Sequence, residues 1–168
     1  MSDMRPISIL LLVGALAIGV GTYSLTWFTQ KAGENTIKLR PTEITVCAPD
    51  GTCTVQNSDG ADYDSTWLGV TNAGKITGGL GLLACVAAAA MAHSRKSQLG
   101  AGGMAIKKQH LLTAAVIGLG LTAASLLMVP MGLSAVAGVY VALAGYVVGV
   151  VGMFLIKDEG VIAPRPVS

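Results

Sequence analysis

Few residues of this 168-residue chain could do chemistry, and two cysteines stand out by their spacing. Cys47 and Cys53 lie equally far from Asp50, each in a segment whose polarity alternates as in a β-strand. Pro49-Asp50-Gly51 is a strong turn signal, so it is expected as the exposed tip of a hairpin. Opposed residues of a hairpin come close enough for a disulfide, which we expect between Cys47 and Cys53. The competing possibility, a cysteine-ligated metal, lacks two further ligands nearby.

Two other groups of side chains could bind a metal ion, but each has a simpler explanation. Asp59, Asp62 and Asp64 offer the oxygen atoms that calcium prefers, yet their spacing matches no complete ligand set. His93 and His110 bracket a polar segment and could share a metal ion, although histidine also suits a membrane interface. We therefore expect a solvated acidic turn and two interfacial histidines, with no metal, no cofactor and no catalytic residues.

The composition of the chain explains why such side chains are scarce. Apolar residues make up 52% of the sequence and charged residues 12%, about half the charged share of an ordinary soluble domain. No Asp, Glu, Lys or Arg occurs in the stretches 6–30, 76–94 and 109–156. A bilayer core about 30 Å thick needs about 20 such residues per helix, and the last stretch is long enough for two helices. This pattern excludes a soluble globular enzyme, a disordered chain and a nucleic-acid-binding domain.

The apolar stretches divide into four expected membrane spans. The first is too long for the core of a signal peptide and ends in an aromatic segment, so we interpret it as a retained helix. Pro130-Met131-Gly132 breaks the last stretch into an antiparallel pair of helices. Lysine and arginine are more numerous on the side of both termini, which predicts a multi-pass protein of the cell membrane with cytoplasmic termini. The expected spans are 7–28, 76–92, 111–129 and 133–156, with an outer loop at 30–72 and a cytoplasmic loop at 93–110.

The outer loop is the only connecting segment large enough for a structure of its own. Alternating residues at 36–40 and 43–47, and again at 52–56 after the turn, predict short antiparallel strands. Trp27 and Trp67 are expected as interfacial anchors at the outer ends of the first two spans. The expected fold of all 168 residues is a single membrane domain. It is an all-α four-helix bundle with a small extracytoplasmic antiparallel β-sheet in the first outer loop.

Small residues line one face of the last expected span. Such a seam lets two helix backbones approach closely in lipid. The seam could pack inside the protein's own bundle or contact another subunit laterally. Because both uses rely on the same van der Waals contacts, the sequence leaves both open. The seam residues recur at alternating spacings of four and three: Gly138, Ala142, Gly145, Gly149 and Gly152.

Ionisable side chains are absent from the expected spans, apart from Lys75, His93 and His110 near their ends. Pumps and ion-coupled transporters use ionisable groups inside the membrane as relays. An intramembrane hydrolase needs a nucleophile and a base at depth. The sequence therefore argues against both classes and favours a protein that is not an enzyme.

The expected architecture resembles the claudin and peripheral-myelin-protein superfamily, which has four spans and a large first outer loop with a cysteine pair. Trp27, the pair Cys47 and Cys53, and the stretch Asp-Tyr-Asp-Ser at 62–65 carry this resemblance. The likeness in topology covers nearly the whole chain, whereas the likeness in motifs covers only these positions. The resemblance implies the superfamily's architecture and association through an outer sheet.

Together these features predict a non-enzymatic integral membrane interaction protein, claudin-like in form. It would associate through the disulfide-pinned outer loop and the small-residue helix face. Its partners would be the lipid bilayer and either copies of itself or other subunits of a larger membrane complex, with no nucleic acid. The alternative is a small channel or transporter component. Its pathway would be lined by small polar side chains: Thr22, Ser24, Thr113, Thr122 and Ser125.

Overall fold

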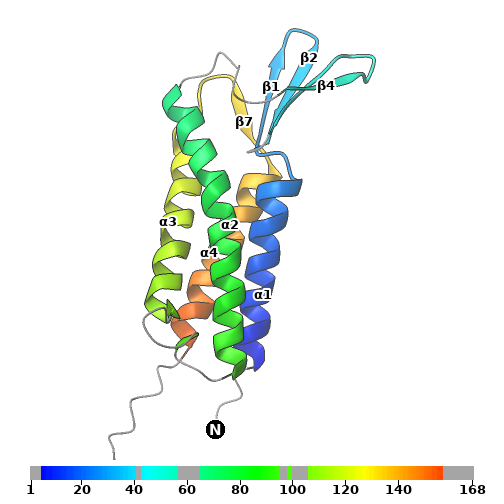
Figure 1. The fold of residues 1–168 in the computed structure, drawn as a ribbon. Coiled ribbons are helices and arrows are strands. Elements are labelled where there is room, and N and C mark those ends of the chain that lie inside the picture. The colour runs from blue at the N-terminus through cyan, green and yellow to red at the C-terminus, as the bar shows by residue number, and fades with distance from the viewer. Residues whose placement is uncertain (1–4, 41–42, 57–64, 95–97, 100–105, 157–168) are drawn as a thin grey trace, which may run out of the picture.

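Four helices are each long and apolar enough to cross a bilayer, so the chain is a four-span membrane protein. They pack side by side as a bundle with a β-sheet at one end, called here the sheet end (Figure 1). The computed structural model describes residues 5–40, 43–56, 65–94, 98–99 and 106–156. The helices are α1 (Arg5–Gly19), continued by the π-helical turn η1 (Val20–Ser24), α2 (Ser65–Ser94), α3 (Lys108–Leu127) and α4 (Ala137–Leu155).

Five strands form one antiparallel sheet in the order β4-β3-β2-β1-β7. The expected fold class, a four-helix bundle with a small antiparallel sheet, is therefore confirmed. A separate pair of two-residue strands, β5 (Gln98–Leu99) and β6 (Ile106–Lys107), joins α2 to α3 at the opposite end. The strands of the larger sheet are β1 (Phe28–Ala32), β2 (Asn35–Leu39), β3 (Ile44–Cys47), β4 (Cys53–Gln56) and β7 (Leu133–Ala135).

The helix ends differ from the expected span ends at the sheet end of the bundle. The first helical segment stops at Ser24 because Phe28 already pairs in the sheet. α4 begins at Ala137, later than expected, because Leu133–Ala135 pairs with β1 as a strand. α2 begins earlier than expected, at Ser65. The pattern of apolar residues in the sequence locates the part of a helix that crosses the apolar layer. In a short apolar run, the same pattern does not tell a strand from a helix.

α1 and α4 approach so closely that their backbones are in contact. A Cβ atom added at Gly145 of α4 would lie 2.7 Å from the Ile18 nitrogen and 2.9 Å from the Gly14 oxygen of α1. A Cβ atom added at Gly21 of η1 would lie 2.5 Å from the Ala142 nitrogen. Only small residues allow this approach, which maximises van der Waals contact in a bundle that lipid surrounds.

The small-residue seam of α4 is therefore used within the chain itself. Leu11 of α1 covers Gly152, and Cys85 of α2 covers Gly149. The interpretation of the seam as a lateral contact for another subunit is wrong, because α1 and α2 already occupy it. The buried seam residues are Gly138, Ala142, Gly145, Gly149 and Gly152.

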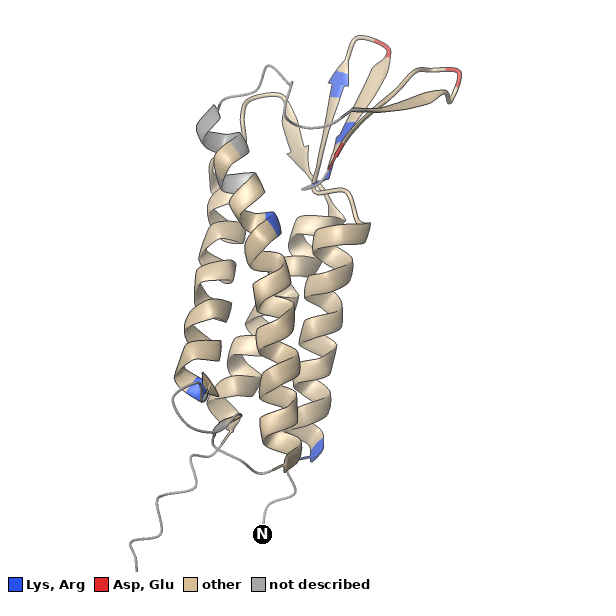
Figure 2. Cartoon of the chain, in the orientation of Figure 1, with Lys and Arg blue, Asp and Glu red and all other residues tan. Residues whose placement is uncertain are grey.

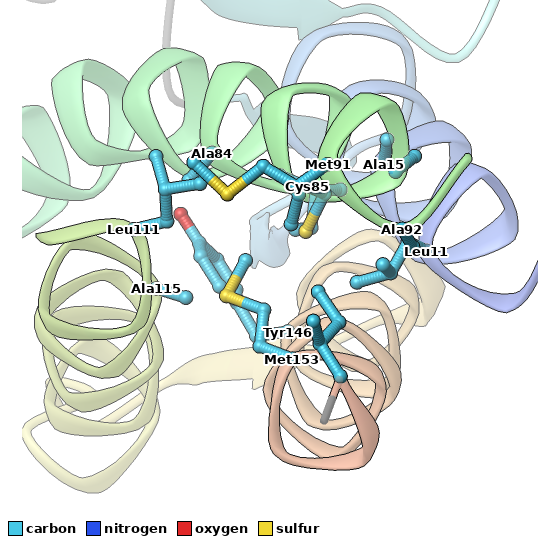
Figure 3. Close-up of a cluster of buried hydrophobic side chains, with 14 residues drawn as sticks. Leu11, Ala15, Ala84, Cys85, Met91, Ala92, Leu111, Ala115, Tyr146 and Met153 are labelled. Atoms are coloured by element: carbon cyan, nitrogen blue, oxygen red, sulfur yellow. The ribbon is translucent and has the colours of Figure 1, made fainter. Parts of the chain in front are cut away.

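Tyr146 fills the centre of the bundle from α4. Its completely buried ring lies between Ala84 of α2 and Ala115 of α3 (Figure 3). Gly81 and Gly118 leave room for the ring, since a Cβ atom at either position would overlap it. The hydroxyl donates a hydrogen bond to the Thr77 carbonyl over 2.8 Å, which satisfies the one polar atom of this side chain.

The seam predicts that one methyl group at Gly145 destabilises the protein. Gly145→Ala forces backbone atoms of α1 and α4 apart, and such overpacking costs about 1–3 kcal/mol. Gly120→Ala on α3 is the matched control, because nothing lies within 4 Å of its added Cβ. Alanine there should be neutral or stabilising, since it is the better helix former. Denaturant unfolding in detergent measures both variants, and equal stability of the two would contradict the packing described.

Candidate functional site

A disulfide joins β3 and β4 next to the hairpin turn, as the sequence predicts. Cys47 and Cys53 are directly paired in the register, and their Cα atoms lie 4.1 Å apart. The bond closes a short ring at the far end of the strands. It therefore limits the freedom of the hairpin tip in the unfolded chain and keeps β3 and β4 in register.

The turn inside this ring is organised by its own hydrogen bonds. The Ala48 amide donates to the Thr52 carbonyl over 2.8 Å, and the Gly51 amide donates to the Ala48 carbonyl over 3.0 Å. Gly51 has φ +87°, a left-handed conformation that favours glycine. Pro49, Asp50 and Gly51 are all exposed, so the structure places the expected hairpin tip in solvent.

Asp50 acts as the acceptor that fixes this turn. Its Oδ1 atom accepts hydrogen bonds from the Thr52 hydroxyl over 2.6 Å and from the Thr52 amide over 2.9 Å. Hydrogen bonds to the charged form favour ionisation. The Thr52 hydroxyl, followed by the Thr52 amide, therefore holds the pKa of Asp50 below its ordinary value.

One face of the sheet rests on the bundle. Phe28, Leu39 and Ile44 stand in one row across three strands and are buried. They cluster with Val139 and Ala142 of α4. The sheet is thereby fixed to the end of the helices by an apolar contact rather than hanging from flexible connections.

The opposite face of the sheet is mostly polar and is called here the outer face. Alternate residues of each strand point away from the buried row, and Lys31 and Lys38 among them are exposed. Figure 2 shows these basic positions on the strands and acidic positions at the two hairpin turns, which are Glu34 and Asp50. The outer face consists of Thr29, Lys31, Thr36, Lys38, Thr45, Cys47, Cys53, Val55 and Ser134, of which Val55 is an exposed apolar residue.

Trp27 is completely buried, so the expectation that it anchors the protein at the lipid interface is wrong. Its indole nitrogen donates to the Gly21 carbonyl over 2.7 Å, and its ring contacts the positions of Gly74 and Gly138. An aromatic residue near the end of a span has the same sequence signature whether it points to lipid or into the protein. Trp67 lies in the first turn of α2, and its side chain is outside the described residues.

Two tyrosines are exposed near the sheet end of the helices, where the boundary of the bilayer core is expected. Tyr23 is 42% exposed and Tyr140 is 53% exposed, each within one turn of the sheet end of its helical segment. Tyrosine combines an apolar ring with a polar hydroxyl and is enriched at membrane interfaces. The Tyr23 hydroxyl donates to the Lys75 carbonyl over 3.1 Å, which also ties η1 to α2. Tyr23 belongs to the aromatic segment that the sequence places at the end of the first span, whereas sequence reasoning missed Tyr140, although its position near a span end was a usable signal.

The candidate metal ligands are not brought together in the part of the chain that the structure describes. Asp59, Asp62 and Asp64 lie outside the described residues. His93 and His110 are exposed at the end opposite the sheet, and the His110 Nδ1 atom accepts the Lys107 amide over 3.4 Å. Among the described residues, no group of three or more His, Cys, Asp or Glu could hold a metal ion.

The polar side chains considered for a channel do not line one path. Ser24 and Thr113 are exposed on the surface of the bundle, whereas Thr22, Thr122 and Ser125 are buried. Thr122 and Ser125 donate to carbonyls of their own helix, over 2.8 Å in each case. The acceptors of these hydroxyl groups are backbone carbonyls of α3 itself, so the hydroxyls are not left without a hydrogen bond in apolar surroundings.

No protein-family model matches the chain, and no curated protein matches it. The architecture implied by the claudin resemblance is present, with four membrane helices and a disulfide-bonded sheet between the first and second. The fifth strand, β7, comes from the connection between α3 and α4.

The Asp50 hydrogen bonds predict a titration that depends on Thr52. Thr52→Val removes the hydroxyl donor and should raise the pKa of Asp50 toward its ordinary value. Because the pKa of Asp50 is lower in the folded than in the unfolded chain, ionised Asp50 stabilises the folded state above about pH 3.9. This stabilisation is lost as the pH falls through the folded pKa. An NMR titration of the Asp50 carboxyl carbon measures this, with Thr54→Val as the control. An Asp50 pKa that is the same in Thr52→Val and wild type would contradict this geometry.

Proposed function

We propose that this is a non-enzymatic membrane interaction protein that presents the outer face of its sheet to a protein partner. The proposal places the sheet outside the cell, as in the claudin and peripheral-myelin-protein superfamily that the chain resembles. The partner is either a second copy of the chain or another subunit of a larger membrane complex.

The observation that carries the proposal is the way the sheet is held. Its base is fixed to the helices by the buried row of Phe28, Leu39 and Ile44, and its far end is closed by the disulfide. A sheet that is packed on the helices at its base, with one hairpin closed by a disulfide, has little conformational freedom to lose when a partner binds. Pre-organisation of this kind favours affinity.

The distribution of charge supports the orientation. Basic residues at the sheet end are Lys31, Lys38, Arg40 and Lys75. The remaining seven of the 11 lysines and arginines belong to the opposite side, which the positive-inside rule assigns to the cytoplasm. The disulfide fits the same orientation, because such bonds persist in oxidising compartments outside the cytosol.

The bundle itself supports an interaction role rather than chemistry. The spans of α1, α3 and α4 contain no Asp, Glu, Lys or Arg between Pro6 and Ser24 or between Gln109 and Leu155. The interior of the bundle is filled by Tyr146, by other large apolar side chains such as Met91 and Met153, and by small residues. Exposed polar side chains lie at both ends of the bundle, and among the described residues those at the sheet end are presented by fixed strands, where a partner could make specific contacts.

The test reverses the charge of the outer face and measures the size of the native complex. Lys31→Glu together with Lys38→Glu changes two exposed side chains of the outer face, which should disperse the complex without unfolding the bundle. Lys75→Glu is the matched control, because Lys75 belongs to the same end but lies on α2. Membranes are extracted in mild detergent, separated on native gels and analysed by mass spectrometry.

The proposal expects a defined complex for wild type and for Lys75→Glu, and a lone chain for the outer-face variant. A complex composed of one protein species indicates self-association, and a fixed set of other chains indicates an accessory subunit. Wild-type protein that migrates as a lone chain would contradict the proposal. A complex of unchanged size in the outer-face variant would do so as well.

A further inference from the structure

The connection between α3 and β7 is an exposed apolar turn. Residues 127–132 read Leu-Met-Val-Pro-Met-Gly, without a polar side chain. Leu127 is 85% exposed and Met131 is 102% exposed, which makes Met131 the most exposed of the large apolar residues described. Val129 is half-buried and packs on the cluster around Trp27, so the turn is held to the protein on one side only.

The helix contacts place this turn at the sheet end of a membrane-length helix. At the far end, the Lys108 Nζ atom donates to the Ile156 carbonyl over 2.8 Å. Gly118, ten residues after Lys108 on α3, contacts the ring of Tyr146, which lies ten residues before Ile156 on α4. These contacts hold the antiparallel helices α3 and α4 side by side, and Leu127 is the last residue of α3 at the sheet end.

The junction with the sheet also contacts the other two helical segments, and α2 continues beyond it to Ser65. Gly138 contacts Thr26 just beyond the end of η1, and Gly74 of α2 lies against Trp27. The helices α3 and α4 have 20 and 19 residues, which at about 1.5 Å per residue is about 30 Å, the thickness of the bilayer core. Leu127 therefore lies at the boundary of the apolar layer, and Met131 lies just beyond it.

The turn also continues the lipid-facing surface of α3. Val116, Gly120 and Leu127 are exposed and recur at helical spacing along one side of this helix. Met131 comes four residues after Leu127, in the turn beyond the end of the helix, and is exposed and apolar as well. Exposed apolar side chains therefore continue from the end of α3 into the turn without a polar residue between Leu127 and Met131.

We propose that the turn 127–132 is an interfacial anchor that lies in the headgroup region of the membrane leaflet on the sheet side. Its occupant is lipid, because the turn extends a lipid-facing surface and lies at the height where that surface ends. The flexible thioether of Met131 suits the irregular boundary between headgroups and acyl chains.

The anchor has a direct connection to the sheet. Leu133 follows the turn at once and pairs with Gln30 of β1, two residues along from the pair of Phe28 with Ala135. The depth of the turn in the membrane therefore fixes the height and tilt of β7, and through β1 the position of the outer face. This inference depends on the four membrane spans and is independent of the proposed protein partner.

A fluorophore at residue 131 tests the anchor. Met131→Cys is labelled with an environment-sensitive dye and reconstituted into phosphatidylcholine vesicles that carry nitroxide quenchers on the upper acyl chain. Cys85 is completely buried and the other two cysteines form the disulfide, so the label goes to the new thiol. Glu34→Cys, at the exposed turn between β1 and β2, is the matched control.

The anchor predicts that the lipid nitroxides quench the dye at residue 131 and that aqueous iodide does not. The dye at residue 34 should show the reverse. Equal iodide quenching at the two sites would overturn the proposal. Protection of residue 131 that disappears when the protein is diluted in lipid would also overturn it, because a second copy would then be the occupant. Since the Met131 side chain is fully exposed, its replacement leaves the fold intact.

Discussion

The structure depends on Trp27, the residue at which the bundle becomes the sheet. Its backbone amide donates to the Leu39 carbonyl of β2, and its carbonyl accepts the Val136 amide at the start of α4, both over 2.9 Å. The indole donates to Gly21 at the end of the first span. One buried residue therefore links the first helical segment, the sheet and the last helix. A tryptophan serves here because a large ring fills the junction while its N–H satisfies a carbonyl of the π-helical turn.

The close packing of the helices and the fixed sheet have the same consequence for function. Small residues bring α1 and α4 into backbone contact, and the ring of Tyr146 fills the remaining interior. The α4 seam is therefore occupied within the chain itself. The polar, exposed and well-held surface is the outer face of the sheet, and the apolar turn beside it sets the height of that face over lipid.

Much of this fold could be predicted from the sequence, because the physics involved is local. Charge-free runs identify the four helices, and Pro49-Asp50-Gly51 between alternating segments identifies the hairpin and its disulfide. β7 could not be found in this way, because Leu133–Ala135 continues an apolar stretch and becomes a strand only by pairing with the distant β1. The direction of Trp27 and the partner of the α4 seam also depend on tertiary contacts, which periodicity does not reveal.

The measurement that tests this account most directly is amide hydrogen exchange of Trp27→Phe compared with wild type. Phenylalanine keeps an aromatic ring but leaves the Gly21 carbonyl without its buried donor, which costs about 1–3 kcal/mol. If Trp27 holds the sheet on the bundle, amides of β1 and β2 should exchange roughly tenfold faster or more, while those in the middle of α4 keep their protection. Unchanged exchange in β1 and β2 would contradict the central role of Trp27.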